Sequence, residues 1–272
     1  MSIQMRYRVN DDPADIYDIT ARSFLSGEIL DKMCNVNDSY FPVVFSVATI
    51  KNNCYYFLSS YDHIDKYVDR TLLEPDRDIC RHFHTIAPTG LFWDKGSKMV
   101  IINIHKDIDN SLMYKIKGVL FNIISNILNN KGYNITHDGN DLYFTINGKR
   151  KKFMGTQIRT KGNWMELVGM INLTVNTDIM ELAVHKDKDK DGVYINTLYE
   201  NIIGGLNEIM TFDVDQFFLD MVTTLASFYN FDLNILPATE DEILYSKKYS
   251  DMYKSKKWIE EGYSATDLFD DV

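Results

Sequence analysis

Short runs of apolar, β-branched and aromatic residues fill much of the first two-thirds of the chain, and such runs are typical of β-strands. They predict strands over residues 40–50, 54–58, 98–104 and 164–175. Elsewhere, apolar residues recur at spacings of three and four, which predicts amphipathic helices. The predicted helices cover residues 13–35, 61–73, 110–130, 197–210 and 213–230, with a short one opening at 176–178 and a last one at Thr239. The two patterns together indicate an α/β fold with a helical C-terminal third.

Residues 139–159 give the clearest local signal. Residues 142–146 form a predicted strand, and Asn147-Gly148 follows as a two-residue turn in which both positions take positive φ. Residues 149–158 then run back as a second strand. The chain is therefore expected to form a β-hairpin here.

The returning strand of this hairpin opens with four consecutive cations, Lys149 to Lys152. Alternation along a strand puts Arg150 and Lys152 on one face and Lys149 and Lys151 on the other. One of these faces would hold fixed positive charge over the sheet, where an isolated ammonium group is costly unless an anion meets it. The alternative interpretation is an edge hairpin whose lysines prevent pairing with another sheet.

The composition of the chain limits the classes of protein to which it can belong. A chain of 272 residues with 45% hydrophobic content can bury a substantial core. Its net charge of −10 weighs against a general nucleic-acid binder. No apolar run is long enough for a membrane span, and residues 1–10 lack the apolar centre of a signal peptide. Three widely spaced cysteines, Cys34, Cys54 and Cys80, argue against a disulfide framework and fit a reducing compartment, so we expect a cytoplasmic protein.

The hairpin also resembles the lysine motif of the lipoate–protein ligase family, within the biotin/lipoate protein ligase superfamily. Asn140-Asp141 begins a strand, a turn follows, and the next strand carries Lys152, two residues, Gly155 and a small residue. The resemblance gives Lys152 the position of the essential lysine and Gly155 that of the family glycine. Residues 240–262 are a second match, with an acid-rich helix start and a tryptophan followed by a glycine.

Residues 78–96 correspond by element order to the family's acyl-binding motif, which has two arginines, a glycine cluster, an aromatic strand and Asp-x-Gly. This chain has Arg81, a single Gly90 in place of three glycines, and Asp94 in the Asp-x-Gly step. Gly169 falls where the family places the wall of the acyl or adenylate site. The loss of glycines puts the substrate in doubt, because glycine lets the backbone approach a ligand closely.

The resemblance implies an α/β (α+β) fold with a mixed, largely antiparallel sheet flanked by helices. Residues 1–192 would form the ligase-like catalytic domain and residues 193–272 a smaller helical C-terminal domain. It also implies a ligase that uses ATP and Mg²⁺ to activate lipoate or a related carboxylic acid and transfers the acyl group to a lysine of a lipoyl-domain-like acceptor, with no nucleic acid or membrane as partner.

The same resemblance distributes the roles within this reaction. Lys152 would stabilise the charge that develops in both transition states. Asn140 and Asp141 would orient the nucleotide, with Mg²⁺ held through Asp141. Gly155 and Gly90 would permit close backbone approach, and Arg81 would reach the triphosphate.

Other interpretations stay open at this point. The chain could be a catalytically inactive ligase-fold protein, for example a viral one, that serves as a binding or structural module. It could instead adenylate another acid, such as biotin or octanoate. Three weaker signals are Cys80 as a nucleophile, His82 with His84 as half a metal site, and residues 187–192 as the opening of a calcium loop.

Overall fold

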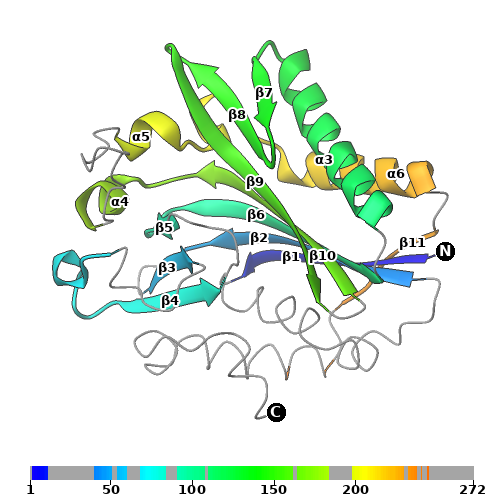
Figure 1. Ribbon diagram of the computed structural model, residues 1–272, viewed down its shortest axis with the longest axis horizontal. Helices are drawn as coiled ribbons and strands as arrows, with labels where there is room; N and C mark the ends of the chain where they lie inside the picture. Colours follow the sequence, from blue (N-terminus) through cyan, green and yellow to red (C-terminus); the bar gives the residue numbers. More distant parts are fainter. Residues whose placement is uncertain are drawn as a thin grey trace.

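The computed structural model describes residues 2–11, 40–50, 54–59, 68–83, 91–107, 110–161, 164–183, 198–229, 232–237, 240 and 244. An eight-stranded sheet runs through these residues (Figure 1). From edge to edge its strands are β11 (Asp232–Ile235), β1 (Ser2–Asp11), β2 (Tyr40–Thr49), β6 (Lys98–Asp107), β10 (Trp164–Thr174), β9 (Lys149–Lys161), β8 (Asp141–Ile146) and β7 (Ile135–Asp138). β1 lies parallel to β2 and β11, and the other pairings in this sheet are antiparallel. The predicted mixed, largely antiparallel sheet flanked by helices is confirmed.

Two long helices, α3 (Asn110–Asn130) and α6 (Val214–Tyr229), cover one face of this sheet (Figure 1). α3 spans the predicted range, and its apolar face supplies Ile116, Leu120 and Ile124 to the main core. α6 adds Phe217 and Phe218, which pack against Phe45 of β2 with ring centroids 5.9 and 5.0 Å away. Helix periodicity therefore identified both elements that bury this face.

Within residues 193–272, the segment 198–229 packs against the sheet. Leu206, Phe217 and Met221 belong to the same hydrophobic cluster as the strands, and β11 pairs with β1. The predicted boundary at residue 192 falls outside the described residues. Beyond it, Leu206, Phe212 and the apolar face of α6 belong to the core of the sheet.

Two helix predictions are wrong in the described residues. Residues 197–210 contain only α5 (Tyr199–Ile202) and the 3-10 turn η3 (Leu206–Glu208), because Gly204-Gly205 runs extended against the sheet. The described part of residues 61–73 holds only the turn η2 (Arg70–Leu72). The predicted helix over 13–35, the calcium-like loop, His84 and Gly90 lie outside the described residues, as does all of 240–262 except Glu240 and Leu244.

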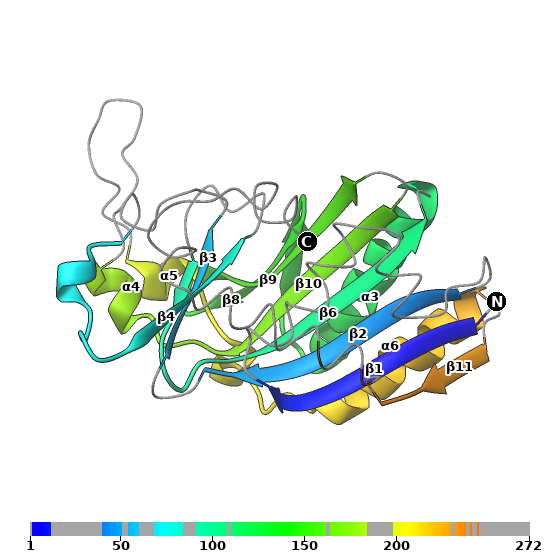
Figure 2. The ribbon, with the colours of Figure 1, turned by 90° about the horizontal axis from the view of Figure 1, so that it is seen from below.

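A second sheet, in the order β4 (Asp78–Phe83), β3 (Cys54–Ser59) and β5 (Leu91–Trp93), lies at one end of the large sheet, beside α4 (Asp178–Ala183) and α5 (Figure 2). It buries Tyr55 and Trp93 almost completely. In the part of the chain that the structure describes, no helix is long and apolar enough to cross a bilayer.

Tyr7 links β1, which lies next to the edge strand β11, to α6. Its hydroxyl donates to Asp215, and its ring stacks on Phe218 with centroids 4.4 Å apart. Burial, together with the hydrogen bond to Asp215, raises the pKa of Tyr7 from 10.0 to about 12. The folded chain thus holds this proton more tightly than the unfolded chain, so the resulting stability is complete below the unfolded pKa and is lost as pH rises through the folded pKa.

We therefore predict that the melting temperature falls less steeply between pH about 10 and about 12 in Tyr7→Phe than in wild type. Near neutral pH the same variant should lose about 1 kcal/mol of unfolding free energy with the hydrogen bond. Tyr114→Phe is the matched control, because Tyr114 is exposed on α3. Parallel pH profiles for wild type and Tyr7→Phe would contradict the prediction.

Candidate functional site

The β8–β9 hairpin forms as the sequence predicts. Asn147 and Gly148 connect the two strands with φ of 50° and 75°, the positive values that a type I′ turn requires at both positions. Arg150 lies over the ring of Tyr143, 3.7 Å from its centroid, on the face that it shares with Lys152. The predicted alternation of the four cations is therefore confirmed, because Lys151 points the other way, to Glu208.

A β-bulge in β9 decides which side chains share this face. Asp141 pairs with Gly155 and Leu142 with Met154, but Tyr143 pairs with Lys152, so Phe153 is an extra residue in the strand. In a regular strand, residues three apart lie on opposite faces. The bulge removes this mismatch and places Lys152 and Gly155 together, on the face turned away from α3 and α6.

Lys152 and Asp141 form an ion pair on that face, with Nζ and Oδ1 2.9 Å apart. Their side chains are 34% and 27% exposed, so a ligand can reach both. Burial raises the pKa of Tyr143, whose hydroxyl lies 3.4 Å from Asp141 Oδ2, and the charge of Asp141 raises it further. A Cβ on Gly155 would lie 3.3 Å from Asp141 Oδ1 and 3.5 Å from Lys152 Nζ, so glycine keeps the space beside the pair open.

A second lysine approaches the hairpin from the helix layer. Lys117 of α3 donates to Asn140 Oδ1 at 2.6 Å and to Gly139 O at 3.2 Å. Burial lowers the pKa of Lys117, and the charge of Asp141 opposes that shift. Asn140 thus faces α3, whereas Asp141 faces Lys152. Sequence reasoning missed Lys117, because helix periodicity shows only that an exposed or half-buried position is polar.

The backbone of Lys152 also pairs with the segment that precedes α6. Gly204 N donates to Lys152 O at 3.0 Å, and Ile203 bridges Lys152 in parallel. Next to it, Lys151 Nζ meets Glu208 Oε2 at 2.5 Å. The segment that precedes α6 therefore anchors the backbone of β9 at Lys152.

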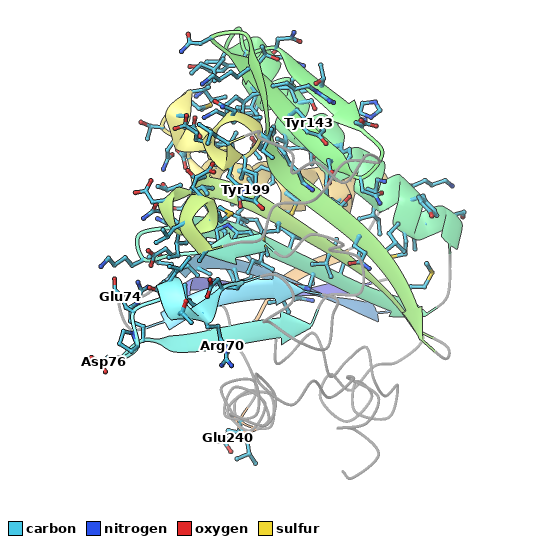
Figure 3. The ribbon with its side chains drawn as sticks, turned by 60° about the vertical axis from the view of Figure 1, so that its left-hand side comes forward. Arg70, Glu74, Asp76, Tyr143, Tyr199 and Glu240 are labelled. Carbon is cyan, nitrogen blue, oxygen red and sulfur yellow. The ribbon has the colours of Figure 1, made fainter. Side chains whose placement is uncertain are left out.

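Two further predicted residues, Asp94 and Gly169, do not join this pair in the described structure. Asp94 is buried in the second sheet, where its Oδ1 accepts from Arg77 and from Lys95 N at 2.5 Å each. Figure 3 shows Glu74, a second partner of Arg77, well separated from Tyr143. Gly169 lies on the helix-covered face, where a Cβ would meet Met154 and Ile102. For Arg81 the structure gives only its backbone pairing with Phe57.

The sheet continues away from the ion pair with buried polar side chains on the same face. One row runs Ser46, Ile101, Met170, Gly155 and Asp141 across five strands. The adjacent row contributes the buried amides of Asn103 and Gln157. This face therefore carries buried polar groups among its apolar residues.

The donor set suits a magnesium–nucleotide complex better than a protein-bound metal. Among the described residues there is no group of three or more His, Cys, Asp or Glu side chains that could hold a metal ion. Magnesium commonly takes one or two carboxylates and completes its shell with phosphate oxygens and water. Asp141 supplies one carboxylate, Lys152 one cation and Gly155 open space, a combination that fits a phosphate-bound magnesium ion.

Comparison with solved structures finds matches over nearly the whole chain. A bipartite lipoate protein ligase from Thermoplasma acidophilum, described with its E2 lipoyl domain, gives a TM-score of 0.67 at 12% identity over 95% of this chain and 96% of that one. P. falciparum LipL1 in complex with lipoate gives 0.65 at 16% identity over 97% and 75%. Lipoate-protein ligase A bound with ATP gives 0.62 at 11% identity over 95% and 98%.

No model of a known protein family and no curated protein matches the sequence. Two of these matches nevertheless cover both chains almost fully, so this chain has the fold of the lipoate–protein ligases. Identities of 10–16% establish the fold and leave activity to be argued from the site itself.

Proposed function

We propose that this protein, which has the lipoate–protein ligase fold, activates a carboxylic acid with ATP and transfers the acyl group to a lysine of an acceptor protein. The observation that carries the proposal is the bulged strand that sets Lys152, Asp141 and Gly155 side by side on the face away from the helices. Paired opposite charges beside an open glycine suit a substrate that brings both a carboxylate and a metal-bound phosphate.

The first step would form an acyl-adenylate. A carboxylate oxygen of the acid attacks the α-phosphorus of ATP, the bond to the β-phosphate oxygen breaks, and pyrophosphate leaves. Negative charge builds up on the α-phosphate oxygens in this transition state, and Lys152 Nζ would stabilise that charge and hold the two anionic reactants together. Magnesium, when bound, neutralises phosphate charge, and Asp141 would be its protein ligand.

The second step would transfer the acyl group. The neutral amine of an acceptor lysine attacks the acyl carbon, the bond to the phosphate oxygen breaks, AMP leaves and the amine gives up its proton. Lys152 would again face the oxygen on which charge develops. One structural neighbour was described with an E2 lipoyl domain, so we propose a lipoyl-domain-like acceptor. The acid is proposed to be lipoate or a related carboxylic acid, since P. falciparum LipL1 was described in complex with lipoate.

A second candidate function is a ligase-fold protein kept for binding alone. The sequence favours it at one place, where the stretch before Leu91 carries a single glycine, Gly90, instead of a glycine cluster. A backbone that cannot approach the phosphates closely would weaken nucleotide binding. This candidate predicts that neither ATP nor any acid binds.

The deciding experiment is acid-dependent exchange of labelled pyrophosphate into ATP, measured with lipoate, octanoate, biotin and short fatty acids. We expect Mg²⁺-dependent exchange with one acid or one narrow group of acids. Folded protein that exchanges with none of them, and that shows no heat of ATP binding, would favour the binding module. A lipoyl domain added to an exchanging mixture should gain the mass of the acyl group.

A further inference from the structure

Lys117 is a cation of the helix layer that the reaction described above does not use. It lies half-buried in the first half of α3, with its ammonium 5.5 Å from the ring centroid of Phe121. Burying an ammonium group costs free energy unless hydrogen-bond acceptors compensate. The acceptors here are Gly139 O and Asn140 Oδ1, which belong to the turn that enters β8.

Asn140 is fixed by two elements at once. Its side-chain oxygen accepts from Lys117, while its backbone oxygen accepts from Thr156 N at 2.8 Å and from Thr156 Oγ1 at 2.9 Å. The side-chain oxygen of Asn140 accepts from the ammonium group of Lys117 on α3. This side chain therefore points to the helix and not to the face that holds Lys152. The next residue is Asp141, whose position follows from the backbone of Asn140.

We propose that Lys117 is a positioning residue, which acts through Asn140 to hold the Asp141 carboxylate in place beside Lys152. Asn140 then has a positioning role as well, instead of the nucleotide contact that sequence resemblance assigns to it. The proposal rests on the proposed function for its effect on activity, because Asp141 is the residue assigned to the magnesium–nucleotide complex. Its structural part concerns the turn alone and can be measured separately.

The activity test is a double-mutant cycle on pyrophosphate exchange with Lys117→Met, Asn140→Ala and the double variant. A hydrogen bond to a charged group contributes enough to predict a rise of about 10-fold or more in KM for MgATP for each single variant. The KM for the acid should stay unchanged. If Lys117 acts through Asn140, the KM for MgATP of the double variant is no higher than that of the more impaired single variant. Lys117→Arg keeps a donor within reach and should restore most of the affinity.

The structural test is amide hydrogen exchange at Thr156, whose N–H bonds Asn140 O. We expect exchange about 10-fold faster in Lys117→Met than in wild type, because the turn opens locally more often. Lys115→Met is the matched control, since Lys115 is an exposed lysine of the same helix.

Unchanged Thr156 exchange in Lys117→Met, relative to Lys115→Met, would overturn the inference whether or not the protein is active. Additive losses in the double variant would also overturn it, because Lys117 would then act by its charge and not through Asn140. A wild type without any pyrophosphate exchange would instead overturn the proposed function and leave the Thr156 measurement to decide the inference.

Discussion

Replacing Lys152 by alanine is expected to lower acid-dependent pyrophosphate exchange by about 10³-fold, a loss comparable with removing a preorganised charge-stabilising donor in other enzymes. The reason is local. Lys152 Nζ lies 2.9 Å from Asp141 Oδ1 and beside the open space above Gly155, where both anionic reactants would meet. Lys152→Arg should also be impaired, since a planar guanidinium differs in shape and reach from an ammonium.

The matched control is Lys149→Ala, because Lys149 belongs to the same run of cations but is exposed at the tip of the hairpin. It should exchange pyrophosphate at nearly the wild-type rate. Circular dichroism and thermal melts of the three proteins would show that the hairpin is intact. If Lys152→Ala kept a tenth or more of the activity, Lys152 could not be the group that stabilises the transition state.

The parts of the fold that are set by residues close together in the sequence were predictable. The Asn147-Gly148 turn and helix α3 follow from local turn chemistry and from apolar periodicity. β1 was missed, although Ile3, Met5, Tyr7 and Val9 alternate with polar residues as in a half-buried strand. Its parallel pairing with β2 and β11 could not be read from the sequence, since the partners lie far apart in the chain.

The candidate site was predicted in part. The resemblance brought Lys152, Asp141 and Gly155 together, but alternation alone would have placed Lys152 and Gly155 on opposite faces. The bulge at Phe153 places Lys152 and Gly155 on one face, and no residue type in the stretch indicates that a bulge forms there. Lys117 was beyond reach for another reason: its contact with Asn140 spans 23 positions and depends on how α3 crosses the hairpin.

The sequence did contain a sign that residues 197–210 do not form one helix, but the apolar periodicity outweighed it in the prediction. Gly204 and Gly205 are poor helix residues, and two in a row lower the helix propensity by about 2 kcal/mol relative to alanine. Their role is steric. A Cβ on Gly204 would lie 2.7 Å from Phe144 Cζ and 2.9 Å from Lys151 Cδ. The pair lets the segment before α6 lie directly on the sheet, against the strand that carries Lys152.

The methyl group added by Gly205→Ala is accordingly expected to lower the stability of the fold more than one added elsewhere in this part of the chain. Its Cβ would lie 2.6 Å from Leu173 O and 2.8 Å from Leu173 C, and these backbone atoms cannot rotate away. Overpacking of this kind costs about 1–3 kcal/mol of unfolding free energy, which urea denaturation would measure. Pyrophosphate exchange should fall as well, because Gly204 N holds the backbone oxygen of Lys152.

Gly118→Ala supplies the control for this substitution. Gly118 lies in α3, and an added Cβ would have nothing within 4 Å, so the same chemical change should leave stability equal or raise it by up to about 1 kcal/mol. Opposite signs for the two substitutions would show that close packing, and not glycine as such, ties the segment before α6 to the strand of Lys152. Equal stability of Gly205→Ala and wild type would mean that this segment does not rest on β10, and the anchoring of the Lys152 backbone would have to be abandoned.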